Sequence, residues 1–390
     1  MKRATDEAIT LDDAYWERLM AATDGAIAPC FQCGVCTAAC PWGLLQDEPA
    51  NVRQILRRAQ LGIPESDGAI WWCATCRACE VMCPRGVPIA EVMLTLRNLA
   101  WQDGAVPKGL SSVLWSLHWD GNPWRRPPSQ REAWTKGAEV KPFEPTDEIL
   151  YYVGCTPSYD NRSQKVARAL AGVLNAAGVS FGTLGEREPC CGDAAYGLGQ
   201  HDYLRQIIAA NVKLFAEAGV GTLVAVSPHC YDMFLNHYPR ENGLQPLHYT
   251  QYLAQLIDEE RLRFQEPLEA KVTFHDACYL GRRNDVYDPP RQVLAAIPGV
   301  TLVEMPRNRE DALCCGGGGG RMWMETAAEE RFANLRVADA AETGADILAT
   351  ACPHCIACLE DSLKLAGSPM RVMDVAEVAA AALGIGRSAQ

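Results

Sequence analysis

The sequence predicts an α + α/β protein, in which a helical amino-terminal domain precedes two tandem α/β modules. Three observations support this fold class. A cysteine motif occurs twice near the amino terminus, and a segment of helical periodicity separates its two copies. From about residue 148, short apolar runs alternate with longer amphipathic stretches, as in parallel α/β sheets. Within that region, a second cysteine pattern repeats at a nearly constant distance along the chain.

The composition narrows the class of protein. The chain has 390 residues, enough for several cores that need no disulfides, yet it contains 18 cysteines. It shows neither a secretory signal nor a run of about 18 uncharged apolar residues, so we expect a cytoplasmic protein with no membrane span of its own. In a reducing compartment, so many cysteines indicate metal binding rather than disulfides. The formal net charge of −12 argues against nucleic acid as a partner.

The first element is the pair of motifs in the amino-terminal third. The segments CFQCGVCTAACP (30–41) and CATCRACEVMCP (73–84) both read C-x2-C-x2-C-x3-C-P. In two-cluster ferredoxins, the first three cysteines of such a motif bind one [4Fe-4S] cluster and the fourth crosses to the other cluster. The motifs therefore predict two cubane clusters. Their expected ligand sets are Cys30, Cys33, Cys36 and Cys83 for one cluster, and Cys73, Cys76, Cys79 and Cys40 for the other.

The spacer between the motifs is predicted to be helical. Val52, Ile55, Leu56 and Ala59 recur at helical spacing, and the segment after the second motif repeats the pattern. This arrangement is similar to the α-helical ferredoxin domain of succinate dehydrogenase iron-sulfur subunits and of the C-type subunit of heterodisulfide reductase. We assign it to residues 1–104. Zinc is the alternative, but structural zinc sites pair two short cysteine hooks across a gap.

Residues 105–147 form the second element, a linker rich in proline and tryptophan. It contains Trp115, Trp119, Trp124 and Trp134. We interpret it as a connector whose tryptophans pack against the flanking domains or a partner subunit. An aromatic and basic binding surface is the alternative interpretation.

The two α/β modules are assigned to residues 148–262 and 263–390. In each module, apolar runs that we expect to form strands lead to cysteines. Equivalent cysteines lie 123 to 125 residues apart, which indicates an internal duplication. Open α/β sheets bind ligands at the carboxyl ends of their strands, so each set should converge on one site. The sets are Cys155, Cys190, Cys191 and Cys230 in the first module, and Cys278, Cys314, Cys315, Cys352 and Cys355 in the second.

The second module reads C-x35-CC-x36-C-x2-C. It resembles the CCG cysteine-rich domain of the B-type and D-type heterodisulfide reductase subunits, which also occurs in iron-sulfur subunits of glycolate oxidase, anaerobic glycerol-3-phosphate dehydrogenase and lactate-utilisation proteins. With two ferredoxin motifs in front of two such domains, nearly the whole chain resembles the D-type subunit of heterodisulfide reductase. The resemblance implies a noncubane [4Fe-4S] cluster on the five cysteines of the second module, with Cys314 and Cys315 at the centre of thiol/disulfide chemistry.

A glycine run follows these two cysteines. Gly316, Gly317 and Gly318 are predicted to bind the cofactor, because backbone N–H groups without side chains can approach cluster sulfides or a bound ligand closely. A flexible loop is the alternative. Arg321 would compensate charge or hold a substrate carboxylate, and an exposed arginine is the alternative.

Three histidines and one further cysteine lie close to the predicted cluster ligands. His354 is the candidate catalytic proton donor to a leaving thiolate, and His229 and His275 lie in comparable positions. For each histidine, the favoured interpretation is that it anchors a turn by hydrogen bonds. Cys358, one turn beyond the last ligand, is expected to be a small buried hydrophobe, with a spare thiol near the cluster as the alternative.

The first module departs from the pattern at Ser227, which stands where the fifth cysteine is expected. Three outcomes are open: a modified cluster with four thiolates and the Ser227 oxygen, a conventional [4Fe-4S] cluster, or an empty site. We expect a further iron-sulfur cluster there, since four of five cysteines remain. The loss of one ligand nevertheless weakens the case for a paired-cluster disulfide cleavage.

These features predict an iron-sulfur electron-transfer subunit of a cytoplasmic redox complex, resembling heterodisulfide reductase. Because the chain has no flavin fingerprint such as G-x-G-x-x-G, its electrons should come from another subunit. A flavoprotein, an electron-transferring flavoprotein or a quinone-linked membrane cytochrome is the expected partner, and the last would place the chain peripherally at a membrane. The alternatives are an electron relay without disulfide chemistry of its own and a zinc-stabilised scaffold.

Overall fold

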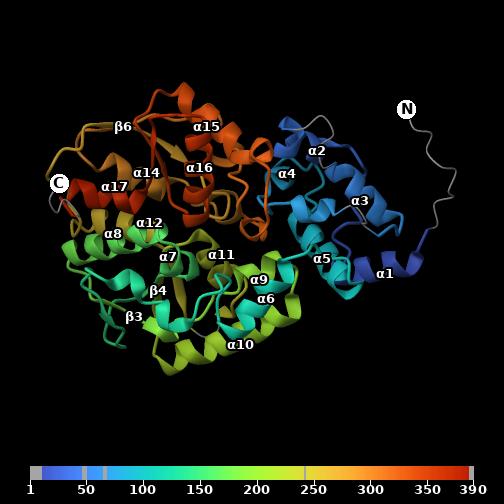
Figure 1. Cartoon of the computed structure of the whole chain (residues 1–390), viewed down its shortest axis with the longest axis horizontal. Coiled ribbons are helices and arrows are strands. Elements are labelled where there is room, and N and C mark those ends of the chain that lie inside the picture. The colour runs from blue at the N-terminus through green and yellow to red at the C-terminus, as the bar shows by residue number, and fades with distance from the viewer. Residues whose placement is uncertain (1–10, 46–50, 65–67, 241–242, 386–390) are drawn as a thin grey trace.

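The structure, a computed structural model, describes residues 11–45, 51–64, 68–240 and 243–385. Figure 1 shows a helical amino-terminal domain, in blue, at one end of the molecule and two α/β modules, in green and in orange to red, at the other. This arrangement confirms the predicted α + α/β class. In the part of the chain that the structure describes, no helix is long and apolar enough to cross a membrane.

The helical domain surrounds the two ferredoxin motifs with short helices. On α3, the four residues predicted from periodicity, Val52, Ile55, Leu56 and Ala59, are all buried. Helix α5 is buried on almost every side because it lies between the ferredoxin motifs and the modules. The elements are α1 (Asp13–Ala22), α2 (Val35–Ala39), η1 (Pro41–Leu44), α3 (Val52–Gln60), η2 (Ala69–Trp72), α4 (Ala78–Val81) and α5 (Ile89–Gln102).

The linker is structured and contributes to the first module. Trp134 is buried and packs edge-on against Tyr151. By contrast, Trp115 and Trp119 are 61% and 71% exposed, so these two do not pack against the flanking domains, and their contact with a partner subunit stays a prediction. The linker elements are α6 (Leu110–Trp119), η3 (Pro128–Gln130), η4 (Ala133–Thr135) and β1 (Lys141–Pro142), of which β1 pairs with the first sheet.

Each module contains one parallel sheet, and the two sheets repeat the same strand order. The first runs β1-β3-β2-β4-β5 and the second β7-β6-β8-β9, so among the described residues the sheets differ only by the linker strand. This shared order bears out the duplication. The strands are β2 (Ile149–Tyr152), β3 (Phe181–Thr183), β4 (Thr222–Ala225), β5 (Gln245–His248), β6 (Ala270–His275), β7 (Val300–Leu302), β8 (Ile347–Thr350) and β9 (Arg371–Asp374).

The two modules pack against each other in a reciprocal way. The second helix after the first strand of each module packs against the last helix of the other, α8 on α17 and α14 on α12. The helices of the first module are α7 (Cys155–Tyr159), α8 (Ser163–Ala176), η5 (Gly185–Arg187), α9 (Asp193–Gly197), α10 (His201–Glu217), α11 (Pro228–Asn236) and α12 (Tyr249–Asp258). Those of the second are α13 (Gly281–Asn284), α14 (Asp288–Ala295), η7 (Arg309–Asp311), η8 (Arg321–Trp323), η9 (Ala328–Glu330), α15 (Phe332–Glu342), α16 (Pro353–Leu365) and α17 (Val375–Ala382).

The strand order determines where ligands can be gathered. In the first sheet, β3 is added on one side of β2, and β4 is then added on the other side. In the second sheet, β7 and β8 are added on opposite sides of β6 in the same way. Such switch points open a crevice at the carboxyl ends of the strands. Cys155 and Cys230 follow β2 and β4, and Cys278 and Cys352 follow β6 and β8, so each crevice receives cysteines.

Candidate iron-sulfur centres

The eight ferredoxin cysteines line two separate small cavities. One cavity, of about 20 Å³, is lined by Cys30, Cys33, Cys36 and Cys83. The other, of about 40 Å³, is lined by Cys40, Cys73, Cys76 and Cys79. The fourth cysteine of each motif therefore lies with the first three of the other motif, which is the grouping that the crossing rule predicts.

The two ferredoxin sites differ in depth. Cys33 is exposed, whereas Cys76 is buried against the second module. Burial, aided by the neighbouring Cys76 thiol, raises the pKa of Cys40 to about 12. Thiols grouped in this way repel one another once ionised, and bound iron supplies the positive charge that holds them as thiolates. Backbone N–H groups add to this, as the Thr75 N–H lies 3.3 Å from Cys73 Sγ. The donor set fits [4Fe-4S] clusters.

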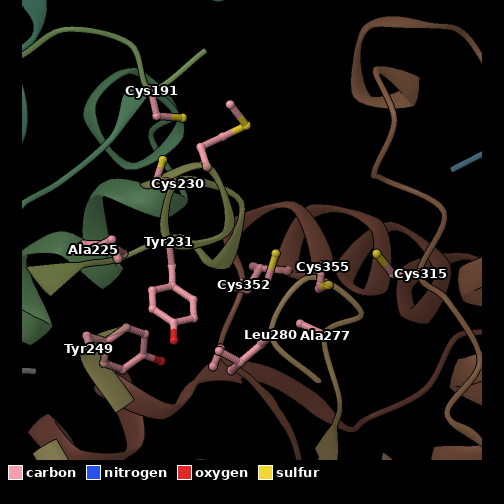
Figure 2. Packing of buried hydrophobic residues seen from close by; sticks show 14 of the residues in the cluster. Cys191, Ala225, Cys230, Tyr231, Tyr249, Ala277, Leu280, Cys315, Cys352 and Cys355 are labelled. Carbon is pink, nitrogen blue, oxygen red and sulfur yellow. The ribbon is translucent and has the colours of Figure 1, made fainter. Parts of the chain in front are cut away.

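The five cysteines predicted for the second module come together in one buried group. Their side chains are in contact in the order Cys278, Cys314, Cys315, Cys355 and Cys352. Figure 2 shows the sulfurs of Cys315, Cys355 and Cys352 next to one another, with those of the first module in a separate group. Three loops thus supply five adjacent thiols, as the cysteine pattern of this module predicts.

The four cysteines of the first module also form a buried group, in which neighbouring side chains are in contact. A linker residue completes it: the Arg131 guanidinium lies 3.7 Å from Cys155 Sγ and pairs with Glu188 at 2.7 Å. Glu188 in turn accepts hydrogen bonds from the backbone N–H groups of Val153 and Gly154. Sequence reasoning missed Arg131, because nothing local distinguishes it from the other arginines of the linker.

Ser227 has a structural task at the position of the missing fifth cysteine. Its Oγ accepts a hydrogen bond from the His229 N–H at 3.3 Å and caps the amino terminus of α11. The equivalent Cys352 begins α16 without a side-chain cap. The serine thus satisfies a helix-end donor that a thiolate bound to iron would leave to other partners.

The second ferredoxin site touches the site of the second module. The side chains of Cys76 and Cys314 are in contact. Arg282 secures this junction, since its Nε donates to the Cys76 carbonyl at 2.7 Å and its Nη1 to the Ala312 carbonyl at 2.5 Å. Two cysteines from different predicted clusters therefore meet at a buried, positively charged contact.

The glycines of the run differ in what they contact. The Gly316 N–H lies 3.2 Å from Cys314 Sγ, as expected for a backbone group that approaches a cluster ligand. Gly318 and Gly319 pack against the ferredoxin domain instead. A Cβ at Gly318 would lie 2.5 Å from the Ala74 carbonyl oxygen, and one at Gly319 would lie 2.7 Å from that of Cys73. The glycines therefore permit close docking of the two domains.

A buried arginine joins the ferredoxin domain to both modules. Arg97 on α5 donates to the carbonyls of Ile70 and Cys73 in its own domain, at 2.8 and 2.6 Å. It also donates to Gly197 of the first module at 2.5 Å and to Gly319 of the second at 2.7 Å. Burial lowers its pKa to about 10, so it remains cationic at neutral pH beside the second ferredoxin site.

Arg321 lies at the entrance to the second-module site. It is only 8% exposed, so the alternative of a solvated surface arginine is wrong. Its guanidinium stacks over Trp42 at 5.1 Å and donates to Thr326 Oγ1 at 2.8 Å. Arg321 lines a cavity of about 460 Å³ that also reaches Cys315, Gly317 and Cys358.

Cys358 is half-buried rather than a fully buried hydrophobe. Its thiol contacts that of Cys315 and faces the same cavity. The spare-thiol alternative therefore describes it better than the core role that we expected.

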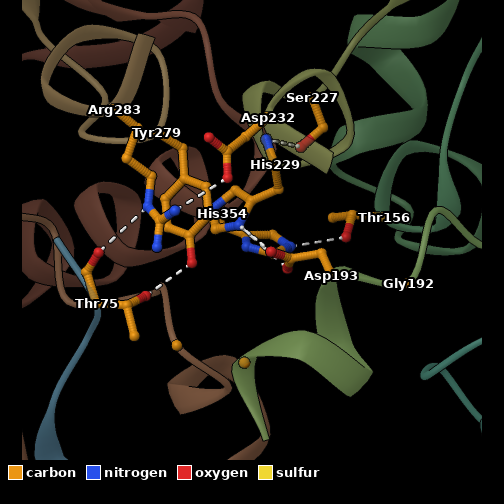
Figure 3. Close-up of polar contacts among 12 residues, drawn as sticks. Thr75, Thr156, Gly192, Asp193, Ser227, His229, Asp232, Tyr279, Arg283 and His354 are labelled. Carbon is orange, nitrogen blue, oxygen red and sulfur yellow. Dashed lines mark hydrogen bonds and ion pairs between the residues drawn. The ribbon is translucent and has the colours of Figure 1, made fainter. Parts of the chain in front are cut away.

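The three histidines are all buried beside the cysteines. His354 Nε2 lies 3.1 Å from Thr156 Oγ1, so this side chain points toward the first module. His229 pairs with Asp193, and its ring stacks on Tyr279 (Figure 3). His275 Nδ1 accepts a hydrogen bond from the buried Arg336 at 3.1 Å.

Comparison with known proteins agrees with this architecture. The cysteine-rich domain family CCG matches residues 149–235 and 272–360, and a 4Fe-4S dicluster domain matches residues 26–87. The chain is 35% identical over 311 residues to the D-type subunit of the dihydromethanophenazine:CoB–CoM heterodisulfide reductase of Methanosarcina barkeri, covering 78% of this chain and 75% of that protein. The chain belongs to the family of D-type heterodisulfide reductase subunits. The resemblance inferred from the motifs is thereby confirmed, as is the presence of [4Fe-4S] binding domains.

Two bacterial relatives of this chain are longer than the chain itself. The "Probable iron-sulfur-binding oxidoreductase FadF" of Bacillus subtilis is 39% identical over 297 residues, which cover 73% of this chain and 42% of that protein. The "EtfAB:quinone oxidoreductase" of Syntrophomonas wolfei is 36% identical over 307 residues, which cover 74% of this chain and 43% of that protein. The matched segment thus spans less than half of either relative.

Proposed function

We propose that this chain is the electron-transfer subunit of a redox complex and exchanges electrons with a disulfide or thiol at its second module. The eight ferredoxin cysteines would hold two cubane [4Fe-4S] clusters, and the five cysteines of the second module a noncubane [4Fe-4S] cluster. Bound there, these groups would supply one-electron redox chemistry. The observation that carries the proposal is the contact between Cys76 and Cys314, which joins the two cysteine systems.

The three cysteine sites become more deeply buried from the first ferredoxin site, through the second, to the site of the second module. Cys33 is exposed and its neighbour Phe31 is 60% exposed, so a partner can approach the first ferredoxin site closely. The second ferredoxin site is deeper, and the five-cysteine site is buried. We expect the partner at the exposed end to be a flavoprotein, an electron-transferring flavoprotein or a quinone-linked membrane cytochrome. Such a complex would work in the cytoplasm, or peripherally at a membrane through that partner.

The cavity beside Cys315 supports chemistry on a small sulfur compound. Its volume of about 460 Å³ is in the range of small-molecule sites, and Arg321 is placed to hold an anionic group of the substrate. Reduction of a disulfide consumes two electrons and two protons and yields two thiols. The catalytic roles predicted for Cys314 and Cys315 concern this step, and the glycines Gly316 and Gly317 would flank the bound group. His354, the candidate proton donor, points toward the first module and does not line this cavity, so we do not assign it a role in this step.

A pure electron relay is the second candidate. The space between the two modules is occupied by Asp193, His229 and His354, whose ligand atoms lie within 4.8 Å of one another. A substrate held between two equal sites would need that space. Ser227 also favours the relay, because it caps a helix and does not supply the fifth thiol of a cluster site.

Two measurements on the anaerobically purified protein test the proposal. Iron and sulfide analysis should give about twelve or more irons per chain: twelve for three four-iron clusters, and more if the first module holds the further cluster expected there. A colourless preparation would instead support the zinc-stabilised scaffold. Electron paramagnetic resonance of the oxidised protein should then change on addition of thiols. Cys155→Ala, in the first module, should keep this response, and Cys355→Ala should lose it. A spectrum that no thiol or disulfide perturbs would leave the relay as the function.

A further inference from the structure

We propose that Asp193, His229 and His354 form a binding site for a divalent transition metal, with zinc as the best match, at the interface between the two modules. One ligand atom from each residue lies within 4.8 Å of the other two. Asp193 begins α9 and His229 lies on α11, both in the first module, whereas His354 lies on α16 of the second. The site therefore requires both modules and is distinct from the iron-sulfur centres.

The pair in the first module already has the spacing of two metal ligands. His229 Nδ1 lies 3.1 Å from each carboxylate oxygen of Asp193. Two atoms bound to one zinc ion at about 2.0–2.1 Å lie about 3.0–3.4 Å apart at ordinary coordination angles. An ion could therefore bind this pair with little movement of either side chain.

His354 supplies the observation that points to a ligand. Its side chain is 8% exposed, and its Nδ1 has no hydrogen-bond partner in the part of the chain that the structure describes. A buried polar atom left without a partner destabilises the fold. Its other ring nitrogen, Nε2, lies 3.1 Å from Thr156 Oγ1. Metal-binding histidines are commonly held in this manner through the nitrogen that does not bind the ion.

His229 is oriented from both sides. Its ring stacks on Tyr279 with centroids 3.8 Å apart, and it also interacts with the Cys352 thiol. Figure 3 shows the two histidine rings and the Asp193 carboxylate converging between the modules. Two imidazoles and one carboxylate are a donor set suited to zinc, whereas the soft thiol groups on either side suit iron-sulfur clusters.

The duplication explains why there is one such site. His229 and His354 occupy equivalent positions of the two modules, 125 residues apart. The residue equivalent to Asp193 in the second module is Gly317, which has no side chain to offer. A bound ion would link α9 and α11 to α16 and hold the two modules together, outside the route between Cys76 and Cys314.

The experiment uses the full-length protein with its clusters, equilibrated anaerobically with Zn²⁺ and then freed of unbound metal. Elemental analysis should find about one zinc per chain. Zinc-edge X-ray absorption should show only nitrogen and oxygen neighbours, at about 2.0–2.2 Å. Asp193→Asn and His354→Gln should each lose this zinc while their iron content stays that of the wild type. His248→Gln, which alters a buried histidine at the end of β5, should retain it.

Three results would overturn the inference: wild-type protein that keeps no zinc, sulfur neighbours around the zinc, or full zinc retention by Asp193→Asn. Sulfur neighbours would place the ion in the cysteine group of the first module instead. If His354→Gln loses iron as well, the decision rests on Asp193→Asn and on the absorption spectrum of the wild type. None of these outcomes depends on whether the chain reduces disulfides.

Discussion

Replacing Gly318 by alanine should loosen the contact between the ferredoxin domain and the second module without altering a cysteine. A Cβ at this position would lie 2.5 Å from the Ala74 carbonyl oxygen and 3.1 Å from Cε2 of Tyr279. Ordinary contacts of this kind begin near 3.4 Å, so the ferredoxin backbone must retreat by roughly 0.9 Å. Gly318 does not have a positive φ, so the strain comes from this contact. Overpacking of this size costs about 1–3 kcal/mol.

Two readouts on the anaerobic holoprotein test this reasoning. The midpoint of thermal unfolding should fall by about 1–4 °C. The magnetic interaction between the reduced ferredoxin clusters and the centre of the second module should weaken, because Cys76 moves away from Cys314. Gly221→Ala is the matched control, since a Cβ there meets nothing within 4 Å. If Gly318→Ala behaves like Gly221→Ala in both measurements, the glycine run does not control docking.

Three further predictions concern other sites. Arg131→Met leaves Glu188 buried without its ion pair and should cost about 3–5 kcal/mol, seen as a lower unfolding midpoint; an unchanged midpoint would contradict the role of this pair. Ser227→Cys should raise the iron content and add a second noncubane signal in electron paramagnetic resonance, although it removes a helix cap worth about 1 kcal/mol. An unchanged iron content would show that the missing thiol is not what limits cluster binding in the first module. Burial raises the pKa of Asp374 to about 8, above its unfolded value of about 3.9. The protonated Asp374 therefore contributes its full stabilisation of the folded protein below about pH 4, and this contribution is lost as the pH rises to about 8. Asp374→Asn should therefore flatten the pH dependence of unfolding between those limits, and a wild-type profile in this variant would refute the assignment.

Local sequence signals predicted the parts of the molecule that depend on neighbours in the chain. Motif spacing gave the grouping of the ferredoxin cysteines, and helical periodicity gave the buried face of α3. The roles of Arg97 and Arg131 were not predictable, because each depends on carbonyls or acids that lie far away in sequence. Arg97 reaches Gly319 across 222 positions, and Arg131 reaches Glu188 across 57. The course of β1 was missed for the same reason, since it forms only by pairing with β3.

The departures from the duplication explain which module the ferredoxin domain contacts through its cysteines. After the paired cysteines, the first module continues with Asp193 to Tyr196, which form most of α9, whereas the second continues with glycines 317–320. Side chains at the positions of Gly318 and Gly319 would collide with the carbonyls of Ala74 and Cys73. Only the glycine-bearing module can therefore bring its first paired cysteine, Cys314, against Cys76. The first module meets the ferredoxin domain through α9 instead, where Tyr196 donates a hydrogen bond to Glu91 and the Gly197 carbonyl accepts one from Arg97. Since both modules retain paired cysteines, the glycine run rather than the cysteine count selects the site joined to the ferredoxin domain.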